Sequence, residues 1–229
     1  MKSICIIPAR GGSKRIPRKN IKDFCGKPII AYAIETALKS GIFDEVMVST
    51  EDEQIAAIAR KYGANVPFMR SREAASDTAP DIVVLTEVLN EYAKLGQTFD
   101  IMCSIYPCTP LVTVERLKQA MDRLIETGAD CVFPAIRYGA PPQRGFVVRD
   151  GQWVRMHPEY TYTRSQDLEP IYFNAGQYHF YNARTYLDKE DYDRYYAPFE
   201  ISEMEAQDVD NEIDWKLAEI KYRMLNGEI

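Results

Sequence analysis

Residues 4–20 have the sequence ICIIPARGGSKRIPRKN. The apolar run at the start predicts a short buried strand, and Gly11 and Gly12 follow it, where the lack of a Cβ lets backbone N–H groups turn towards an anion. The ten residues from Arg10 to Lys19 include five cations and no acid. Because loops after parallel strands line the ligand crevice of an open α/β sheet, this basic loop (residues 9–20) is expected to bind a polyphosphate such as a nucleoside triphosphate.

The basic loop differs from two common phosphate-binding motifs. A Walker A loop would need the pattern GxxxxGK[ST], and no GxG occurs anywhere in the chain, so kinase and dehydrogenase functions are disfavoured. The alternative is a solvated basic loop or a nucleic-acid-binding patch. Two glycines directly after a buried strand argue against that alternative.

The residues after the basic loop alternate between helical and strand-like patterns. Apolar residues at helical spacing predict helices over residues 28–40, 53–62, 80–95 and 114–127. Short apolar runs predict strands over residues 3–8, 45–49, 64–69, 101–106 and 131–136. Such alternation predicts an α/β fold, in which a mostly parallel sheet is covered by helices on both faces.

A different pattern begins beyond residue 137. Two extended stretches, Arg144–Arg149 and Gln152–Met156, flank Asp150-Gly151, which is a strong β-hairpin signal. A lone hairpin is marginally stable in water, so its apolar side chains are expected either to pack on the chain's own core or to pair with a second subunit. These apolar side chains are Phe146, Val148, Trp153 and Val154.

The C-terminal part returns to the α/β pattern. Strands are expected over residues 177–181 and 199–204, and a helix over residues 211–225. The helix prediction rests on an apolar stripe formed by Ile213, Leu217, Ile220 and Met224.

The composition excludes several classes of protein. With 46% hydrophobic and 27% charged residues, 12 Gly and 13 Pro, the chain is not disordered, collagen-like or a coiled coil. No apolar run approaches the roughly 20 residues of a membrane-spanning helix, and the first residues lead directly into a strand, so neither a membrane-spanning nor a secreted protein is expected. Five scattered cysteines without a CxxC pair disfavour a disulfide scaffold or a zinc cluster and favour a reducing cytoplasm.

Acidic residues concentrate near the C-terminus, in contrast to the basic loop. Asp208-Val209-Asp210 places two carboxylates on one side of an extended segment, with Val209 turned towards the core. Because the chain has only two histidines, a metal ion is expected to be held by oxygen, and paired carboxylates suit Mg²⁺. The alternative is helix capping by Asp210 or Asn211, with Asp214 in the first turn. Together with the basic loop, the pair favours metal binding, and one aspartate could serve both roles.

Four segments of the chain carry a resemblance to a known family. They are residues 6–21, Ala75-Ser76-Asp77-Thr78, Phe173-Asn174-Ala175-Gly176 and Asp208-Val209-Asp210. In these segments the chain resembles the CMP-nonulosonate (CMP-N-acetylneuraminate) synthetases over nearly its whole length. Within that family, residues 15–32 are most similar to the members that use pseudaminic acid, a bacterial sugar related to sialic acid.

Two segments depart from the pattern of the CMP-sialate members. Those members typically have Gln-Pro-Thr-Ser-Pro-Leu where this chain has Tyr106-Pro107-Cys108-Thr109-Pro110-Leu111. They often have Arg before the Asn-Gly pair, where Tyr172-Phe173 stands here. Both departures fall in the expected sugar pocket, so they disfavour N-acetylneuraminate and leave the nucleotide half intact.

The resemblance implies a fold and a reaction. The fold is a three-layer, mostly parallel, Rossmann-like nucleotidyltransferase sheet in a single domain over residues 1–229, with residues 138–172 as an inserted hairpin that forms a homodimer. The reaction transfers CMP from CTP to the anomeric hydroxyl of a nine-carbon 2-keto sugar acid, expected to be pseudaminic acid, and releases pyrophosphate with Mg²⁺ as cofactor. The expected location is the bacterial cytoplasm, with no nucleic-acid or membrane partner.

The resemblance also implies roles for individual residues. The catalytic residues are Arg10, Lys14, Lys19 and Asp210, and the metal ligands are Asp208 and Asp210. The nucleotide-binding residues are Ala9, Arg10, Gly11, Gly12, Ser13, Lys14, Asn20, Arg70, Thr78 and Asp81. The sugar-binding residues are Tyr106, Arg144, Arg164, Tyr172 and Asn174.

Some of these roles have structural alternatives. Asp81 could simply complement a helix dipole, the tyrosines could pack in the core, and the two arginines could be surface residues or could serve a neighbouring subunit's pocket. Two other functions stay open. A CMP-N-acetylneuraminate or CMP-Kdo synthetase would differ only in the acceptor pocket, and a non-catalytic nucleotide-binding or RNA-binding module would not need the acidic pair.

Overall fold

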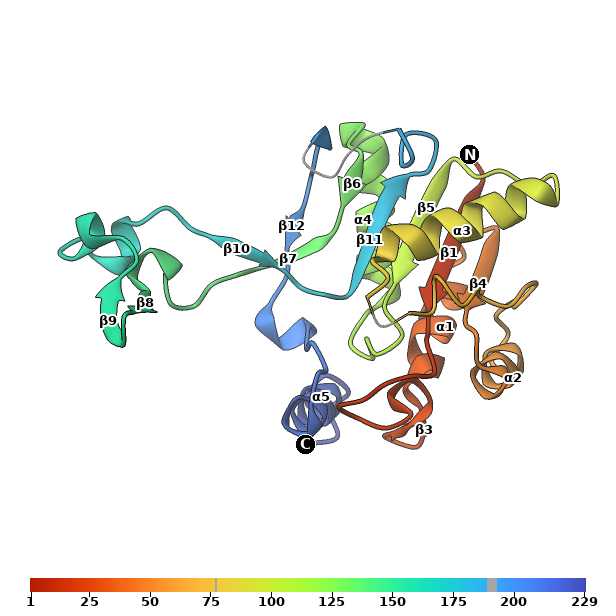
Figure 1. Cartoon of the computed structure of the whole chain (residues 1–229), viewed down its shortest axis with the longest axis horizontal. Helices are drawn as coiled ribbons and strands as arrows, with labels where there is room; N and C mark the ends of the chain where they lie inside the picture. The colour runs from red at the N-terminus through yellow and green to blue at the C-terminus, as the bar shows by residue number, and fades with distance from the viewer. Residues whose placement is uncertain (77, 189–192) are drawn as a thin grey trace.

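The computed structural model describes residues 1–76, 78–188 and 193–229, and its centre is a five-stranded sheet. The strand order is β4 (Glu45–Ser49), β1 (Ser3–Pro8), β5 (Ile101–Ile105), β11 (Tyr178–Asn182) and β6 (Cys131–Val132). β1 pairs in parallel with β4 and β5, whereas β11 runs antiparallel to both of its neighbours. The predicted α/β fold with a mostly parallel sheet is therefore confirmed (Figure 1).

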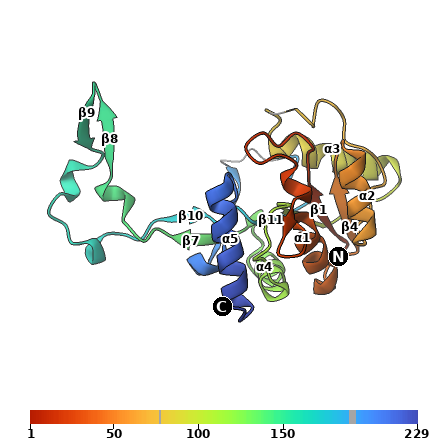
Figure 2. The same ribbon diagram turned by 90° about the horizontal axis from the view of Figure 1, so that it is seen from below.

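Helices cover both faces of this sheet because the side chains of β1 alternate between them. Cys5 and Ile7 pack with α1 (Ile29–Ser40), α2 (Glu53–Lys61) and α4 (Val114–Thr127). Ile4 and Ile6 point the other way and pack with α3 (Asp81–Lys94). The two apolar clusters make three layers, with α3 on the face opposite α1 and α4 (Figure 2). Among the described residues, no helix has both the length and the apolar character of a membrane span.

A third apolar cluster joins the two ends of the chain. The basic loop is followed by a small hairpin of β2 (Asp23–Phe24) and β3 (Lys27–Pro28), and α5 (Glu212–Leu225) packs against it. Phe24 meets Trp215 edge to face at 5.5 Å between ring centroids. Ile16 of the basic loop and Val209 of the acidic segment (residues 208–210) are both buried in this cluster. The cluster therefore holds the acidic segment next to the basic loop.

The prediction of one strand over residues 131–136 is wrong in one respect, because these residues form parts of two strands. β6 ends at Val132, and β7 (Pro134–Arg137) belongs to a second sheet between β10 (Tyr172–Asn174) and β12 (Phe199–Glu200). Proline has no backbone N–H to donate and is tolerated at the first position of a strand, which is where Pro134 stands. β7 and β10 lead out of the body of the protein into a long projection (Figure 1).

This projection, the arm (residues 138–171), ends in the predicted hairpin. β8 (Phe146–Arg149) and β9 (Gln152–Arg155) pair antiparallel, and Asp150 and Gly151 both have positive φ, at 52° and 76°. Both central residues of a type I′ turn require this conformation, so the hairpin prediction is confirmed. The arm extends away from the body, and only Leu168 in it is buried (Figure 2). The hairpin therefore does not pack on the core of its own chain.

Two other predictions differ from the structure. Residues 64–69 form no strand beyond a single bridge between Asn65 and Met47, and β12 stops at Glu200 before a 3₁₀ turn over Glu203–Glu205. The α5 helix is confirmed, but the apolar stripe that predicted it lies on its exposed side. Its buried residues are Trp215 and Ala218.

Candidate active site

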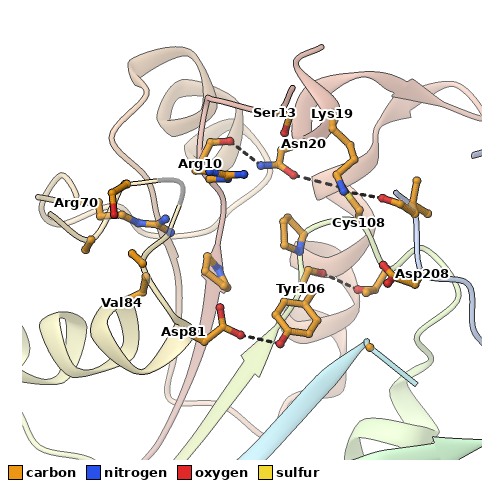
Figure 3. A pocket seen from close by; sticks show the side chains of 18 residues that line it. Arg10, Ser13, Lys19, Asn20, Arg70, Asp81, Val84, Tyr106, Cys108 and Asp208 are labelled. Atoms are coloured by element: carbon orange, nitrogen blue, oxygen red, sulfur yellow. Dashed lines mark hydrogen bonds between the residues drawn. The ribbon is translucent and has the colours of Figure 1, made fainter. Parts of the chain in front are cut away.

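A pocket of about 540 Å³ lies where β1 and β5 end (Figure 3). Five separate parts of the chain build its walls: the basic loop, the segment that leads into α3, the loop after β5, the turn at Gly176 and the segment at Asp208. Eight residues predicted to belong to the site line it together: Arg10, Ser13, Lys19, Asn20, Arg70, Asp81, Tyr106 and Asp208. The predicted crevice at the carboxyl ends of parallel strands is therefore present.

The remaining predicted residues do not line this pocket in the described part of the chain. They are Ala9, Gly11, Gly12, Lys14, Thr78, Arg144, Arg164, Tyr172, Asn174 and Asp210. Six of them, Ala9, Gly11, Gly12, Lys14, Thr78 and Asp210, are direct chain neighbours of lining residues. Asp77, part of the motif over residues 75–78, lies outside the described residues.

The basic loop is fastened to the end of β4 by acidic residues. The Gly11 N–H donates to Glu51 Oε1 at 2.7 Å, and the Arg18 guanidinium pairs with Asp52. A Cβ on Gly11 would lie 2.6 Å from Asp52 Oδ2, so a side chain at this position would displace the Asp52 carboxylate. In this chain the Gly11 N–H therefore meets an anion, but that anion is a carboxylate of the protein. The hydrogen bond from Arg18 lowers the pKa of Asp52 to about 2.

Two polar contacts hold the loop's far end in the pocket. Asn20 Nδ2 donates to the backbone carbonyl of Arg10 at 2.8 Å, and Lys19 Nζ donates to the carbonyl of Val209 at 2.6 Å. The second contact joins residues 190 positions apart in the sequence. It brings a lysine ammonium group beside the carboxylate of Asp208, and both line the pocket.

The acidic segment divides its two carboxylates between different environments. Val209 is buried, as predicted, and Asp208 lines the pocket. Asp210 pairs with Arg15 at 2.6 Å. Desolvation and the neighbouring charge of Asp210 raise the pKa of Asp208.

Helix capping is carried out by a different residue. Asn211 Oδ1 accepts from the N–H groups of Ile213 and Asp214, and Asp214 accepts in turn from the backbone of Asp210 and Asn211. The Asn211 part of the capping alternative is thus confirmed, and the Asp210 carboxylate does not cap. Neither carboxylate of the pair is used for capping: Asp208 lines the pocket and Asp210 pairs with Arg15.

The donor set is compatible with Mg²⁺ as a cofactor. No group of three or more His, Cys, Asp or Glu side chains in the described residues could enclose a metal ion. Mg²⁺ does not need such a cage, because it commonly binds one or two carboxylates together with water and substrate phosphates. Desolvation is the main cause of the raised pKa of Asp208 and the charge of Asp210 adds to it, and a bound cation would offset both.

The wall towards α3 contains a buried arginine and a bridging tyrosine. Arg70 is 7% exposed, and its guanidinium donates to Ser49 Oγ at 3.0 Å and to the Ser49 carbonyl. Desolvation lowers the pKa of Arg70. Tyr106 Oη donates to Asp81 Oδ2 at 2.6 Å across the pocket (Figure 3). A residue expected to bind the sugar thus contacts a residue expected to bind the base, so the two parts of the pocket adjoin.

The other predicted sugar residues lie at the rim or farther away. Tyr172 is 43% exposed, which excludes core packing for it, and a hydrogen bond with Glu200 raises its pKa. Asn174 ends β10, two residues before pocket-lining Gly176. Arg144 and Arg164 lie on the arm, where they contact Ser165 and Asp167 respectively, and they do not line the pocket of their own chain.

The sequence placed residues 106–111 in the expected sugar pocket but gave Cys108 and Thr109 no role. Cys108 Sγ lies 3.3 Å from Asn20 Oδ1, to which it donates, and Thr109 Oγ1 donates to the carbonyl of Tyr106 at 2.7 Å. Both line the pocket, as do Val84 and Gly176. The available signal was position, because β5 lies next to β1 in the sheet and their following loops share one edge.

Comparisons with known proteins agree with this geometry. The family model described as "Cytidylyltransferase" matches residues 4–219. The chain is 40% identical over 226 residues to "Pseudaminic acid cytidylyltransferase" of Campylobacter jejuni subsp. jejuni serotype O:2, which covers 98% of this chain and 97% of the relative. It is 34% identical over 236 residues to "CMP-N,N'-diacetyllegionaminic acid synthase" of Legionella pneumophila, covering 100% of this chain and 99% of the relative.

A solved structure supports the fold. CMP:2-keto-3-deoxy-manno-octonic acid synthetase, determined as a complex with CTP, superposes with a TM-score of 0.72 at 19% identity, covering 100% of both chains. The family match and the relatives extend over nearly the whole chain, including the basic loop and the acidic segment. This chain belongs to the cytidylyltransferase family.

Proposed function

We propose that this enzyme transfers CMP from CTP to the anomeric hydroxyl of pseudaminic acid and releases pyrophosphate. One observation supports nucleotidyl transfer above all: the pocket joins the basic loop at one end of the chain to the acidic segment at the other. The choice of sugar is supported by the name of the relative that is 40% identical over 98% of this chain.

In the proposed reaction the sugar hydroxyl oxygen attacks the α-phosphorus of CTP. A new P–O bond forms, the bond from the α-phosphorus to the bridging oxygen breaks, and pyrophosphate leaves with that oxygen. Arg10 and Lys19 line the pocket and would stabilise the negative charge that develops on the leaving group. Lys14, on the same loop, would bind the outer phosphates.

Asp208 and Asp210 would hold Mg²⁺, which would neutralise charge around the α-phosphate when bound. We assign the proton of the attacking hydroxyl to Asp210. The ion pair with Arg15, at 2.6 Å, holds this carboxylate beside the basic loop.

The two subsites follow from the walls of the pocket. Ser13 and Asn20 would position phosphate and ribose, and Arg70, Thr78 and Asp81 would border the cytosine. Tyr106, Tyr172 and Asn174 would contact the sugar. The hydroxyl proton of Tyr106 is already donated to Asp81, so this tyrosine would meet the sugar with its ring and with an oxygen lone pair.

We also propose that the enzyme is a homodimer formed through the arm. Phe146, Val148 and Trp153 on the hairpin are 50%, 58% and 75% exposed, and exposed apolar groups of this kind mark interaction surfaces. Arg144 or Arg164 would then reach the partner's pocket and bind the sugar carboxylate. We place the enzyme in the cytoplasm, where CTP is made.

The test is pyrophosphate release from CTP in the presence of Mg²⁺ and a panel of nonulosonic acids. We expect release with pseudaminic acid, no release without a sugar, and kcat/KM for N-acetylneuraminate lower by about 10²-fold, the scale of two unpaired polar groups in a buried pocket. A preference for legionaminic acid or N-acetylneuraminate would replace the sugar and keep the reaction. Failure of every sugar to release pyrophosphate would reject the transferase function itself.

A further inference from the structure

The side-chain amide of Asn174 is held at both ends. Its Oδ1 accepts from the Gly176 N–H at 2.8 Å, and its Nδ2 lies 2.6 Å from His179 Nε2. A backbone N–H can only donate, so the first contact fixes which end of the amide is oxygen. The NH₂ group must therefore face His179.

The orientation of Asn174 in turn fixes the state of His179. Because Asn174 Nδ2 can only donate, His179 Nε2 must accept with its lone pair, and the ring proton sits on Nδ1. The hydrogen bond exists only with a neutral imidazole in this tautomer. In this pair the amide orientation of Asn174 and the tautomer of His179 are thus both fixed.

The imidazole of His179 is fixed by aromatic neighbours. It stacks on Tyr181 at 5.8 Å between centroids, contacts Phe133 at 5.4 Å and meets the edge of Tyr106 at 6.1 Å. On the neighbouring strand it lies opposite Ser104, whose small side chain leaves room for the ring. These contacts hold Nε2 in place, so the imidazole can hold Asn174 in turn.

Asn174 does not itself line the pocket but lies beside the end of it where Asp208 stands. Gly176, which fixes its oxygen, lines the pocket, and a Cβ on Gly176 would lie 3.9 Å from the Asp208 side chain. Tyr106, which touches His179, lines the same pocket. With one N–H and one oxygen lone pair in use, Asn174 retains one N–H and one lone pair for a ligand.

We propose that His179 is a positioning residue for the sugar, because it fixes the donor and acceptor of Asn174 that face the acceptor substrate. This inference rests on the proposed function. An amide side chain with one donor and one acceptor in fixed positions is complementary to an N-acyl group, which also has one of each. The substrate class that this pair selects is therefore an acylamino sugar acid.

The test compares His179→Phe with His179→Gln. Phenylalanine keeps a ring for Tyr181 and Phe133 but cannot accept a hydrogen bond, whereas the glutamine carbonyl can accept from Asn174 Nδ2. We expect His179→Phe to raise KM for pseudaminic acid about tenfold, the scale of one misplaced hydrogen-bonding group, while kcat and the dissociation constant for CTP change less than about twofold. His179→Gln should recover most of the loss.

A double-mutant cycle with Asn174→Ala identifies the route of the effect. If His179 acts through Asn174, His179→Phe should change KM for the sugar less than about twofold when Asn174 is already alanine. An equal loss in both backgrounds, an unchanged KM in His179→Phe, or a parallel rise in KM for CTP would overturn the proposal. Wild-type protein that turns over no acylamino sugar acid would reject the proposed function, and the positioning role with it.

Discussion

The basic loop and the arm differ in how much of their structure a single chain completes. The loop is tied to the rest of the protein by three contacts: Cys108 Sγ donates to Asn20, Lys19 donates to Val209, and Arg18 pairs with Asp52. The arm buries only Leu168 and leaves Trp153 75% exposed. The pocket residues that are expected to bind the nucleotide therefore all come from one chain. The arm, in contrast, exposes surface that a single chain does not cover.

The largest expected effect falls on the acidic segment. Asp208→Asn and Asp210→Asn should each lower kcat by at least about 10²-fold, because each removes a charge placed for the reaction. Asp214→Asn is the matched control, since this residue belongs to the capping box of α5 and not to the pocket. It should lower the melting temperature and leave kcat near the wild-type value. Turnover is measured by pyrophosphate release. Near-normal turnover in Asp208→Asn and Asp210→Asn would leave the acidic segment with a purely structural role.

Two lysines of the basic loop provide the next comparison. Lys19 lines the pocket and donates to Val209, whereas Lys14 does not line it. Lys19→Ala should lower kcat/KM for CTP on the order of 10²-fold, since charge-assisted contacts to phosphate and the link between the two ends of the chain are both lost. Lys14→Ala should have a smaller effect on the same quantity, and Lys118→Ala, on the outer face of α4, should have none. The reverse order for Lys14 and Lys19 would show that the loop reorganises around CTP.

The sequence predicts a feature of this protein well when the residues that form it are close together along the chain. The α4 helix spans the predicted residues, since Thr113 caps its start and Gly128, at φ 62°, ends it. These capping signals lie within a few residues of the helix ends that they determine. The contact between Lys19 and Val209 and that between Tyr106 and Asp81 depend on strand order and helix packing, which no local pattern contains.

Apolar patterns have a second limit, which the arm and α5 both illustrate. Trp153 and Phe146 fit a strand pattern and Ile213 and Leu217 fit a helix pattern, yet all four side chains are at least 43% exposed. Periodicity indicates which side chains share a face, but it does not say whether that face meets the chain's own core or another molecule. Pro134, in contrast, is the first residue of β7, and a proline at that position is a local reason for a new strand to begin there.

The arm offers the next test of the comparison. Trp153→Glu should weaken the proposed dimer by about 30-fold in its dissociation constant, the scale of losing a central aromatic anchor. Sedimentation velocity measures the change, with Leu95→Glu as a control at an exposed apolar position on the body of the protein. CTP should bind the resulting monomer as it binds the wild type, because the pocket residues of the nucleotide half come from one chain. Wild-type protein that is monomeric at micromolar concentration would reject the dimer.

The smallest expected effect concerns the pair that fastens the basic loop. The pKa of Asp52 is about 2 in the folded protein against an ordinary value of 3.8, so its ionised form stabilises the fold. A carboxylate with a depressed pKa contributes fully above its unfolded pKa, and the contribution is lost as the pH falls from about 4 towards 2. Because the Arg18 side chain is 40% exposed, solvent screening reduces the contribution to about 1 kcal/mol.

Arg18→Met should therefore lower the free energy of unfolding by about 1 kcal/mol at pH 7, and the difference from wild type should shrink as the pH falls below 4. Urea unfolding between pH 7 and pH 3 measures both values, with Lys118→Met as a control for the loss of an exposed cation. Asp52 also caps α2 by accepting from the N–H groups of Gln54 and Ile55, and this function survives in the variant. The loss should therefore be smaller than in Asp52→Ala, which removes the cap as well as the ion pair. If Arg18→Met and wild type differed equally at pH 7 and pH 3, the ion pair would not be what holds the loop, and the Gly11 contact with Glu51 would be the stronger fastening.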